Sequence, residues 1–153
     1  MPRELSERGK AFLKLKEGLR LWAYLDDAGI WTIGYGHTGP EVHEGLIWSQ
    51  HEADAMFERE VGRFGSGVDK LVGDRELNQN QFDALVIFAY NIGLANFGHS
   101  GVLSSIRYGN IPGALHSWAQ WNHVHDPKSG ELVVSLGLSK RRQAEITLFQ
   151  TPV

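Results

Sequence analysis

Two carboxylates and one hydroxyl lie close together in the N-terminal part of the sequence, and their types point to a hydrolytic site. Residues 16–38 read KEGLRLWAYLDDAGIWTIGYGHT and contain Glu17, Asp26 and Thr32. Cleavage of an acetal requires one carboxyl group that carries a proton and a second that is ionised. A neighbouring hydroxyl can hold the attacking water. This stretch therefore favours glycoside hydrolysis as its chemistry.

Both carboxylates also have a plain structural interpretation. Glu17 is expected at the C-terminal end of a helix, where the helix dipole disfavours a negative charge by about 0.3–1 kcal/mol. A glutamate that is simply solvated at the end of a helix fits the sequence equally well. Asp26 opens the turn DDAG, and aspartate is a favoured turn residue. The spacing within this turn does not distinguish Asp26 from Asp27.

The segment IWTIGYG predicts a strand with two different faces. Alternation places Thr32, Gly34 and Gly36 on one face and the bulky residues between them on the other. The glycine face leaves room for a group to approach the backbone. Tight packing of a helix on the sheet explains the two glycines equally well.

The elements that must position these residues follow from hydrophobic periodicity and capping residues. A first helix is predicted over residues 6–16, followed by a hairpin or three-stranded antiparallel sheet that ends near Gly45. Ser49 and Glu52 form a capping-box pattern at the start of a long helix. Its glycines at positions 62, 65 and 67 mark either the end of this helix or a close packing contact.

A second capping-box pattern, Asn78 with Gln81, opens a strongly apolar helix that is expected to be central. Asn91 is expected to cap and orient this helix. Shorter helices are predicted to begin at residues 100, 112 and 138, and residues 126–131 read as an exposed turn or loop. The sum is an α+β fold.

Composition narrows the classes of function. The chain has 153 residues, a net charge of −3 and no cysteine, which excludes disulfides, thiolate catalysis and cysteine-based zinc sites. The slight acidity argues against general nucleic-acid binding. No apolar run is long enough for membrane insertion, and the N-terminus is too polar for a signal peptide. His123, His125 and Asp126 suggest a cation site, but a loop fits them better, so no metal and no cofactor is predicted.

The stretch that contains Glu17, Asp26 and Thr32 resembles the phage-type lysozymes, the muramidase family of endolysins. All three residues match the family pattern, and the match selects Asp26 over Asp27. The resemblance continues through IWSQHEADAMFEREV, LNQNQFDALVIFAYNIG and GLSKRRQAEITLF, in the same order. These blocks together cover nearly the whole chain.

The resemblance implies a lysozyme-like fold in which residues 1–153 form one catalytic domain. Its parts are a sheet lobe over 18–47, a connecting helix over 49–71, and a helical lobe made of 1–16 and 78–153, with the cleft between the lobes. The implied substrate is bacterial peptidoglycan, cleaved between N-acetylmuramic acid and N-acetylglucosamine. The implied context is a monomer that waits in the host cytoplasm for a membrane-permeabilising, holin-type partner and then acts on the cell wall.

The resemblance also implies roles for individual residues. Glu17 would be the general acid, Asp26 the second carboxylate, and Thr32 the residue that positions water. Arg141, in the terminal block, is a candidate to orient Glu17, although it also fits a simple ion pair with Glu145. The motif residues Gly34, Tyr35 and His37 are expected to bind substrate or orient the site, and His37 also fits a structural hydrogen bond between the lobes.

Two other functions stay open at the level of sequence. A lytic transglycosylase uses one acid and leaves an anhydro product, and the presence of both Asp26 and Thr32 disfavours it. A non-catalytic wall-binding module has no need of the acid pair.

Overall fold

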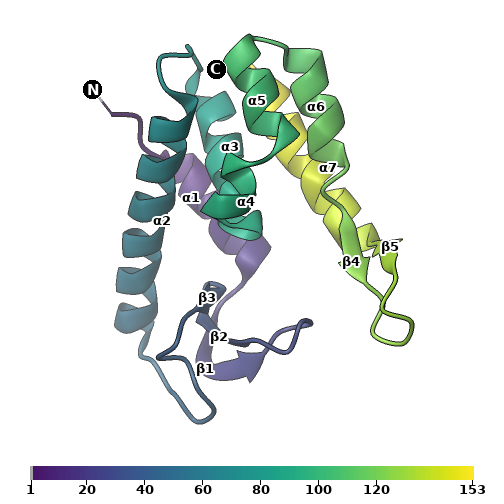
Figure 1. Cartoon of the computed structure of the whole chain (residues 1–153). Coiled ribbons are helices and arrows are strands. Elements are labelled where there is room, and N and C mark those ends of the chain that lie inside the picture. Colours follow the sequence, from purple (N-terminus) through teal and green to yellow (C-terminus); the bar gives the residue numbers. More distant parts are fainter. Residues whose placement is uncertain (1) are drawn as a thin grey trace.

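The computed structural model describes residues 2–153, and it confirms the α+β class. Its helices are α1 (Glu7–Glu17), α2 (Gln50–Val72), α3 (Gln79–Ile92), α4 (Leu94–Gly98), α5 (Gly101–Tyr108), α6 (Ile111–Ala119) and α7 (Leu136–Gln150). Its strands are β1 (Arg20–Leu25), β2 (Trp31–Gly34), β3 (His37–Thr38), β4 (His123–His125) and β5 (Leu132–Val134). The long helix α2 connects the part that carries β1–β3 to the remaining helices (Figure 1).

Helix α1 begins and ends at residues that the sequence marks. The side chain of Ser6 accepts a hydrogen bond from the backbone N–H of Gly9, which satisfies one of the free donors of the first turn. Gly18 follows the last helical residue with a positive φ of 70°, a conformation that glycine adopts without steric cost. The helix therefore ends at Glu17, one residue later than predicted.

The first sheet is antiparallel in the order β1-β2-β3, which selects the three-stranded alternative. Thr32 pairs with Tyr24 of β1 and with Thr38 of β3, so it lies in the middle strand. The predicted alternation is wrong beyond Gly34, because β2 ends there and the chain turns through positive φ at Gly34 and Gly36. These two glycines thus form a turn and do not line one strand face.

Helix α2 is stabilised at its N-terminus by the predicted capping box. Ser49 Oγ accepts from the Glu52 N–H at 3.1 Å, and Glu52 Oε1 accepts from the Ser49 N–H at 3.1 Å. The three glycines lie inside the helix and not at its end. At Gly67 an added Cβ would lie 2.7 Å from Leu94, so this glycine permits a close helix contact.

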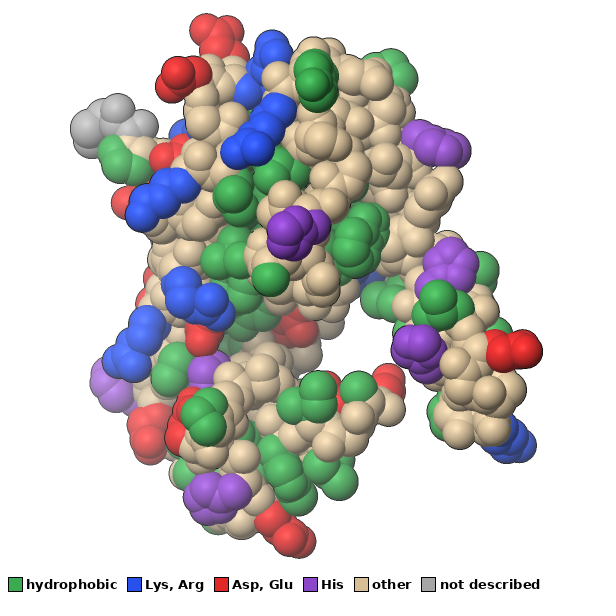
Figure 2. Space-filling view, in the orientation of Figure 1, with side chains coloured by type: hydrophobic (Ala, Val, Ile, Leu, Met, Phe, Trp, Pro, Cys, Tyr) green, Lys and Arg blue, Asp and Glu red, His purple; other side chains and the backbone are tan. Residues whose placement is uncertain are grey.

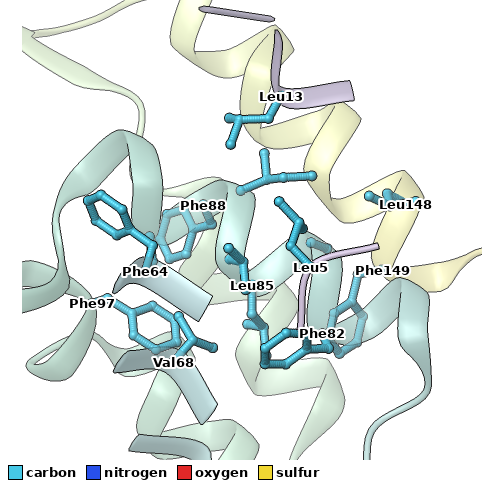
Figure 3. Packing of buried hydrophobic residues seen from close by; sticks show 14 of the residues in the cluster. Leu5, Leu13, Phe64, Val68, Phe82, Leu85, Phe88, Phe97, Leu148 and Phe149 are labelled. Atoms are coloured by element: carbon cyan, nitrogen blue, oxygen red, sulfur yellow. The ribbon is translucent and has the colours of Figure 1, made fainter. Parts of the chain in front are cut away.

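Helix α3 forms the centre of the hydrophobic core. Its own capping box, Asn78 with Gln81, is present as predicted, and its apolar residues pack against α1, α2 and α7 (Figure 3). The buried carboxylate of Asp83 accepts hydrogen bonds from the Ser6 N–H and from Gln79 Nε2, which ties α3 to the start of α1. No helix within residues 2–153 is long and apolar enough to cross a membrane.

The segment between α6 and α7 differs from the prediction. Residues 123–134 form an antiparallel hairpin, β4 with β5, where a loop was expected around the turn at 126–131. Valine and other strand-favouring residues on both sides of this turn explain the pairing. The hairpin projects from the helices (Figure 1). Helix α7 begins at Leu136 with Ser135 as its cap, two residues before the predicted start, because the Ser135 side chain accepts from the Leu138 N–H.

Candidate active site

The two carboxylates and the hydroxyl singled out from the sequence line one cavity. This cavity has a volume of about 480 Å³, a size typical of ligand sites, and it lies where the end of α1, the first sheet, α2 and the end of α3 meet. Glu17, Asp26 and Thr32 all contribute to its wall. In Figure 2 the surface is hollowed between the part that carries β1–β3, at the bottom of the view, and the helices above it.

Glu17 is the last residue of α1, and its side chain is only 16% exposed. Its Oε1 accepts a hydrogen bond from Arg141 Nη1 at 2.8 Å. On its other side it meets Gly36, where an added Cβ would lie 2.8 Å from Glu17 Oε2. The backbone of the turn at Gly36 therefore holds the carboxylate from one side while Arg141 holds it from the other.

Asp26 combines the turn role and the cavity role that the sequence left as alternatives. Its Oδ1 accepts from the backbone N–H groups of Ala28 and Ile30, each at 2.9 Å, and this shapes the β1–β2 turn. These two donors stabilise a negative charge on the carboxylate. Asp27 is exposed and does not contribute to the cavity wall. The structure thus places Asp26, and not its neighbour, beside Glu17 and Thr32.

Thr32 is 4% exposed and its orientation is fixed. Its hydroxyl donates to the carbonyl oxygen of Ile30 at 2.9 Å. Because the hydroxyl proton is already donated to the backbone, Thr32 can only accept a hydrogen bond from any further partner. A water molecule in the cavity can donate to this oxygen.

Gly34 and Tyr35 lie outside the cavity wall. At Gly34 an added Cβ would lie 3.0 Å from the Trp48 ring, so the missing side chain makes room for Trp48 and not for a ligand. The Tyr35 ring is buried in the core. Its backbone carbonyl accepts a hydrogen bond from the Tyr90 hydroxyl at 2.6 Å. Tyr35 therefore reaches the cavity only indirectly, by holding Tyr90, which does line it.

His37 lines the cavity and also links two elements. Its Nδ1 contacts Glu60 of α2 at 3.0 Å, its Nε2 bonds to Glu41, and its ring stacks on Trp48. These contacts attach β3 to the connecting helix. They agree with the structural hydrogen bond that the sequence suggested for His37.

Arg141 makes both of the contacts that the sequence offered as alternatives. Besides its bond to Glu17, its Nε donates to Glu145 Oε2 at 3.0 Å, one helical turn further along α7. A guanidinium has several donors in a fixed plane, which lets one side chain serve two carboxylates. Arg141 therefore joins α7 to the end of α1.

The hairpin does not bring His123, His125 and Asp126 together as a cation site. The two histidines contact the carbonyls of Gln120 and Gly130, while Asp126 Oδ1 accepts from a backbone N–H of the turn. Within residues 2–153 no three His, Cys, Asp or Glu side chains are grouped as metal ligands would be.

Comparison with known proteins agrees with this geometry. The phage lysozyme family model matches residues 14–145, which include Glu17, Asp26, Thr32 and Arg141. The chain belongs to the phage lysozyme family. The resemblance seen in the sequence is thereby confirmed.

Individual relatives match this chain over almost its whole length. It is 41% identical over 149 residues to an endolysin of Bacillus phage B103, covering 96% of this chain but only 54% of that protein. The chain thus spans about half the length of this relative. It is 35% identical to an endolysin of Acyrthosiphon pisum secondary endosymbiont phage 1, covering 96% of this chain and 98% of that protein. Among solved structures, the muramidase domain of SpmX from Asticaccaulis excentricus superposes with a TM-score of 0.86 at 37% identity, covering 98% of this chain and 100% of that domain.

Several residues of this candidate site were not found from the sequence. Tyr24, Glu60 and Tyr90 line the cavity, and no local pattern distinguishes them from ordinary core or surface residues. Burial, followed by the nearby charge of Glu17, raises the pKa of Tyr90 well above its ordinary value, so its hydroxyl keeps the proton that it donates to the Tyr35 carbonyl. Asn91 does not cap α3, which ends at Ile92 with Gly93 as its cap. Its Oδ1 instead accepts from Arg142.

Proposed function

We propose that this protein is a peptidoglycan hydrolase of the endolysin type. In this proposal it cleaves the β-1,4 bond between N-acetylmuramic acid and N-acetylglucosamine. The observation that carries the proposal is the convergence of Glu17, Asp26 and Thr32 on one cavity between the sheet and the helices. The endolysin relatives and the muramidase domain support the choice of substrate.

The three residues are suited to different steps of acetal cleavage. Glu17, largely shielded from solvent, would donate a proton to the oxygen of the leaving sugar. Asp26, whose Oδ1 accepts hydrogen bonds from two backbone N–H groups, would act as the second carboxylate, activating water or stabilising positive charge on the sugar ring. Thr32 would accept a hydrogen bond from the attacking water, because its own proton is already donated to Ile30.

The remaining candidates have supporting roles in this proposal. Arg141 orients the Glu17 carboxylate, and His37 fixes β3 to α2 at the cavity wall. Gly34 and Tyr35 act indirectly, by admitting Trp48 and by holding Tyr90.

The biological setting is part of the proposal. Residues 1–153 would act as one catalytic domain and as a monomer, with bacterial peptidoglycan as the partner. The protein would remain in the host cytoplasm until a membrane-permeabilising protein of the holin type gives it access to the wall. The endolysin relatives support bacterial peptidoglycan as the partner.

The general-acid assignment is tested by Glu17→Gln, which keeps the shape of the side chain and removes its proton. Because general acid catalysis typically contributes about 10²–10⁴-fold, clearance of cell-wall suspensions should fall by at least about a hundredfold. Glu44→Gln is the matched control, since Glu44 is exposed in the part of the chain that carries β1–β3 and is absent from the cavity wall. Wild-type clearance by Glu17→Gln would refute the assignment.

The reaction type is tested by mass spectrometry of the muropeptides that the wild-type protein releases. Hydrolysis leaves a reducing end on each product. Anhydro ends would show a lytic transglycosylase instead, and wall binding without any released product would show a binding module.

A further inference from the structure

A buried pair of charges is connected to Glu17 through Arg141 and has no part in the mechanism proposed so far. Glu145 and Arg142, three residues apart on α7, are 0% and 1% exposed. Burial of ionised groups is costly unless they are paired and hydrogen-bonded. The positions of these two residues therefore need an explanation.

Every polar contact of Glu145 comes from a hydrogen-bond donor. Its Oε1 accepts from Trp118 Nε1 at 2.9 Å and lies 3.3 Å from Arg142 Nε, and its Oε2 accepts from Arg141 Nε at 3.0 Å. Burial raises the pKa of Glu145, while Arg142, Arg141 and the Trp118 N–H oppose that rise. A protonated Glu145 carboxyl would point its O–H at one of these donors. The surroundings of Glu145 therefore favour its ionised form.

Arg142 depends on Glu145 for its counter-charge. One of its terminal nitrogens donates to Asn91, and its guanidinium lies over the Phe88 ring at 5.0 Å. Its Nε and Nη1 make no hydrogen bond within the described structure. The carboxylate nearest to this buried cation is Glu145, at 3.3 Å.

Arg141 connects this cluster to the cavity. The same guanidinium that donates to Glu145 donates through Nη1 to Glu17 Oε1 at 2.8 Å. Two arginines thus face two carboxylates. A general acid must carry its proton, and protonation of Glu17 leaves Glu145 as the sole negative charge of the four. Without Glu145, the buried Arg142 and the partly exposed Arg141 would both act on Glu17 and favour its ionised form.

We propose that Glu145 is a positioning residue that balances the charges of Arg141 and Arg142, and thereby allows Glu17 to keep its proton at the working pH. The inference rests on the proposed function of Glu17 as the general acid. It also explains why an arginine, which by itself opposes that role, is tolerated beside Glu17.

Other ionisable groups near Glu17 stay the same in all the variants below. The sheet and its turn contribute Tyr24, Asp26 and His37 to the shared cavity wall, and the helices contribute Glu60, Arg63 and Tyr90. A change in pH dependence on substitution of Glu145 or Arg142 can therefore be assigned to the buried cluster.

The test is the pH profile of kcat/KM on purified peptidoglycan from about pH 4 to 9, where the alkaline limb reports loss of the proton from the acid. For Glu145→Gln, this limb should move to lower pH by about one unit or more, because Arg141, which donates to Glu17 at 2.8 Å, then loses its second carboxylate partner. Arg142→Met leaves Arg141 as the one cation beside both Glu145 and Glu17. The alkaline limb of this variant should therefore move to higher pH.

The double variant Glu145→Gln/Arg142→Met removes one charge of each sign, and its alkaline limb should return toward the wild-type position. It also keeps the test decisive if Glu145→Gln alone does not fold. A merely structural role of Glu145 predicts lower activity at every pH with the limb unmoved in all three variants, and that result would overturn the proposal.

Failure of this proposal and failure of the proposed function give different results. If Glu17→Gln is inactive and the limb does not move in any of the cluster variants, Glu17 remains the acid and only the role of Glu145 is wrong. If Glu17→Gln clears cell walls at the wild-type rate, the proposed function itself is wrong.

Discussion

Replacing Gly36 with alanine should damage the site more than the fold. Gly36 has a φ of 77°, and a residue with a Cβ in the left-handed region costs roughly 1–2 kcal/mol. For a chain of this size that corresponds to a loss of about 2–8 °C in the melting temperature. The added Cβ would also lie 2.8 Å from Glu17 Oε2, so the carboxylate must shift away from Gly36, and this disturbs its hydrogen bond with Arg141. Because a misplacement of about 1 Å can cost a hundredfold in rate, clearance should fall by about 10- to 100-fold.

Gly130→Ala separates the two effects. Gly130 has a similar φ of 72° but lies in the β4–β5 turn, where an added Cβ meets no atom within 4 Å. Both variants should lose melting temperature in scanning calorimetry, and Gly130→Ala should clear cell walls at the wild-type rate. Equal activity of the two variants would refute the conclusion that the backbone at Gly36 positions Glu17.

Three further predictions concern stability. Leu85→Ala in the fully buried part of α3 should lower the free energy of unfolding by about 2–5 kcal/mol in urea titrations. The control is Leu15→Ala. Because Leu15 is 84% exposed, this change should alter the free energy of unfolding by no more than about 0.5 kcal/mol. Ser49→Ala removes the α2 cap and should cost about 0.5–2 kcal/mol in the same assay; an unchanged value would show that the capping box contributes nothing. The hydrogen bond from His37 lowers the pKa of Glu41, so this pair stabilises the fold above the ordinary value of 4.5, and the contribution is lost as the pH falls through the lowered pKa. Thermal melts of Glu41→Gln should therefore depend less steeply on pH in the acid range than those of the wild-type protein.

Local signals in the sequence predicted most element boundaries correctly. Both capping boxes were recognised because each involves residues only three positions apart, and glycine at position 18 marked the end of α1 within one residue. The errors fall where backbone geometry or strand pairing overrides the pattern. The end of β2 at Gly34 depends on a positive φ, and the β4–β5 hairpin depends on pairing across a turn.

The sequence by itself determined the types of the candidate site residues and the family, since these depend on residue identity and order along the chain. The tertiary structure decided which of the alternatives each residue fulfils. Asp26 proved to be both turn former and cavity residue, and Arg141 bonds to Glu17 across 124 positions as well as to Glu145 on its own helix. Periodicity reports only on neighbours within a helix or strand. The charges that surround Glu17 come from separate elements, and packing of the core brings them together.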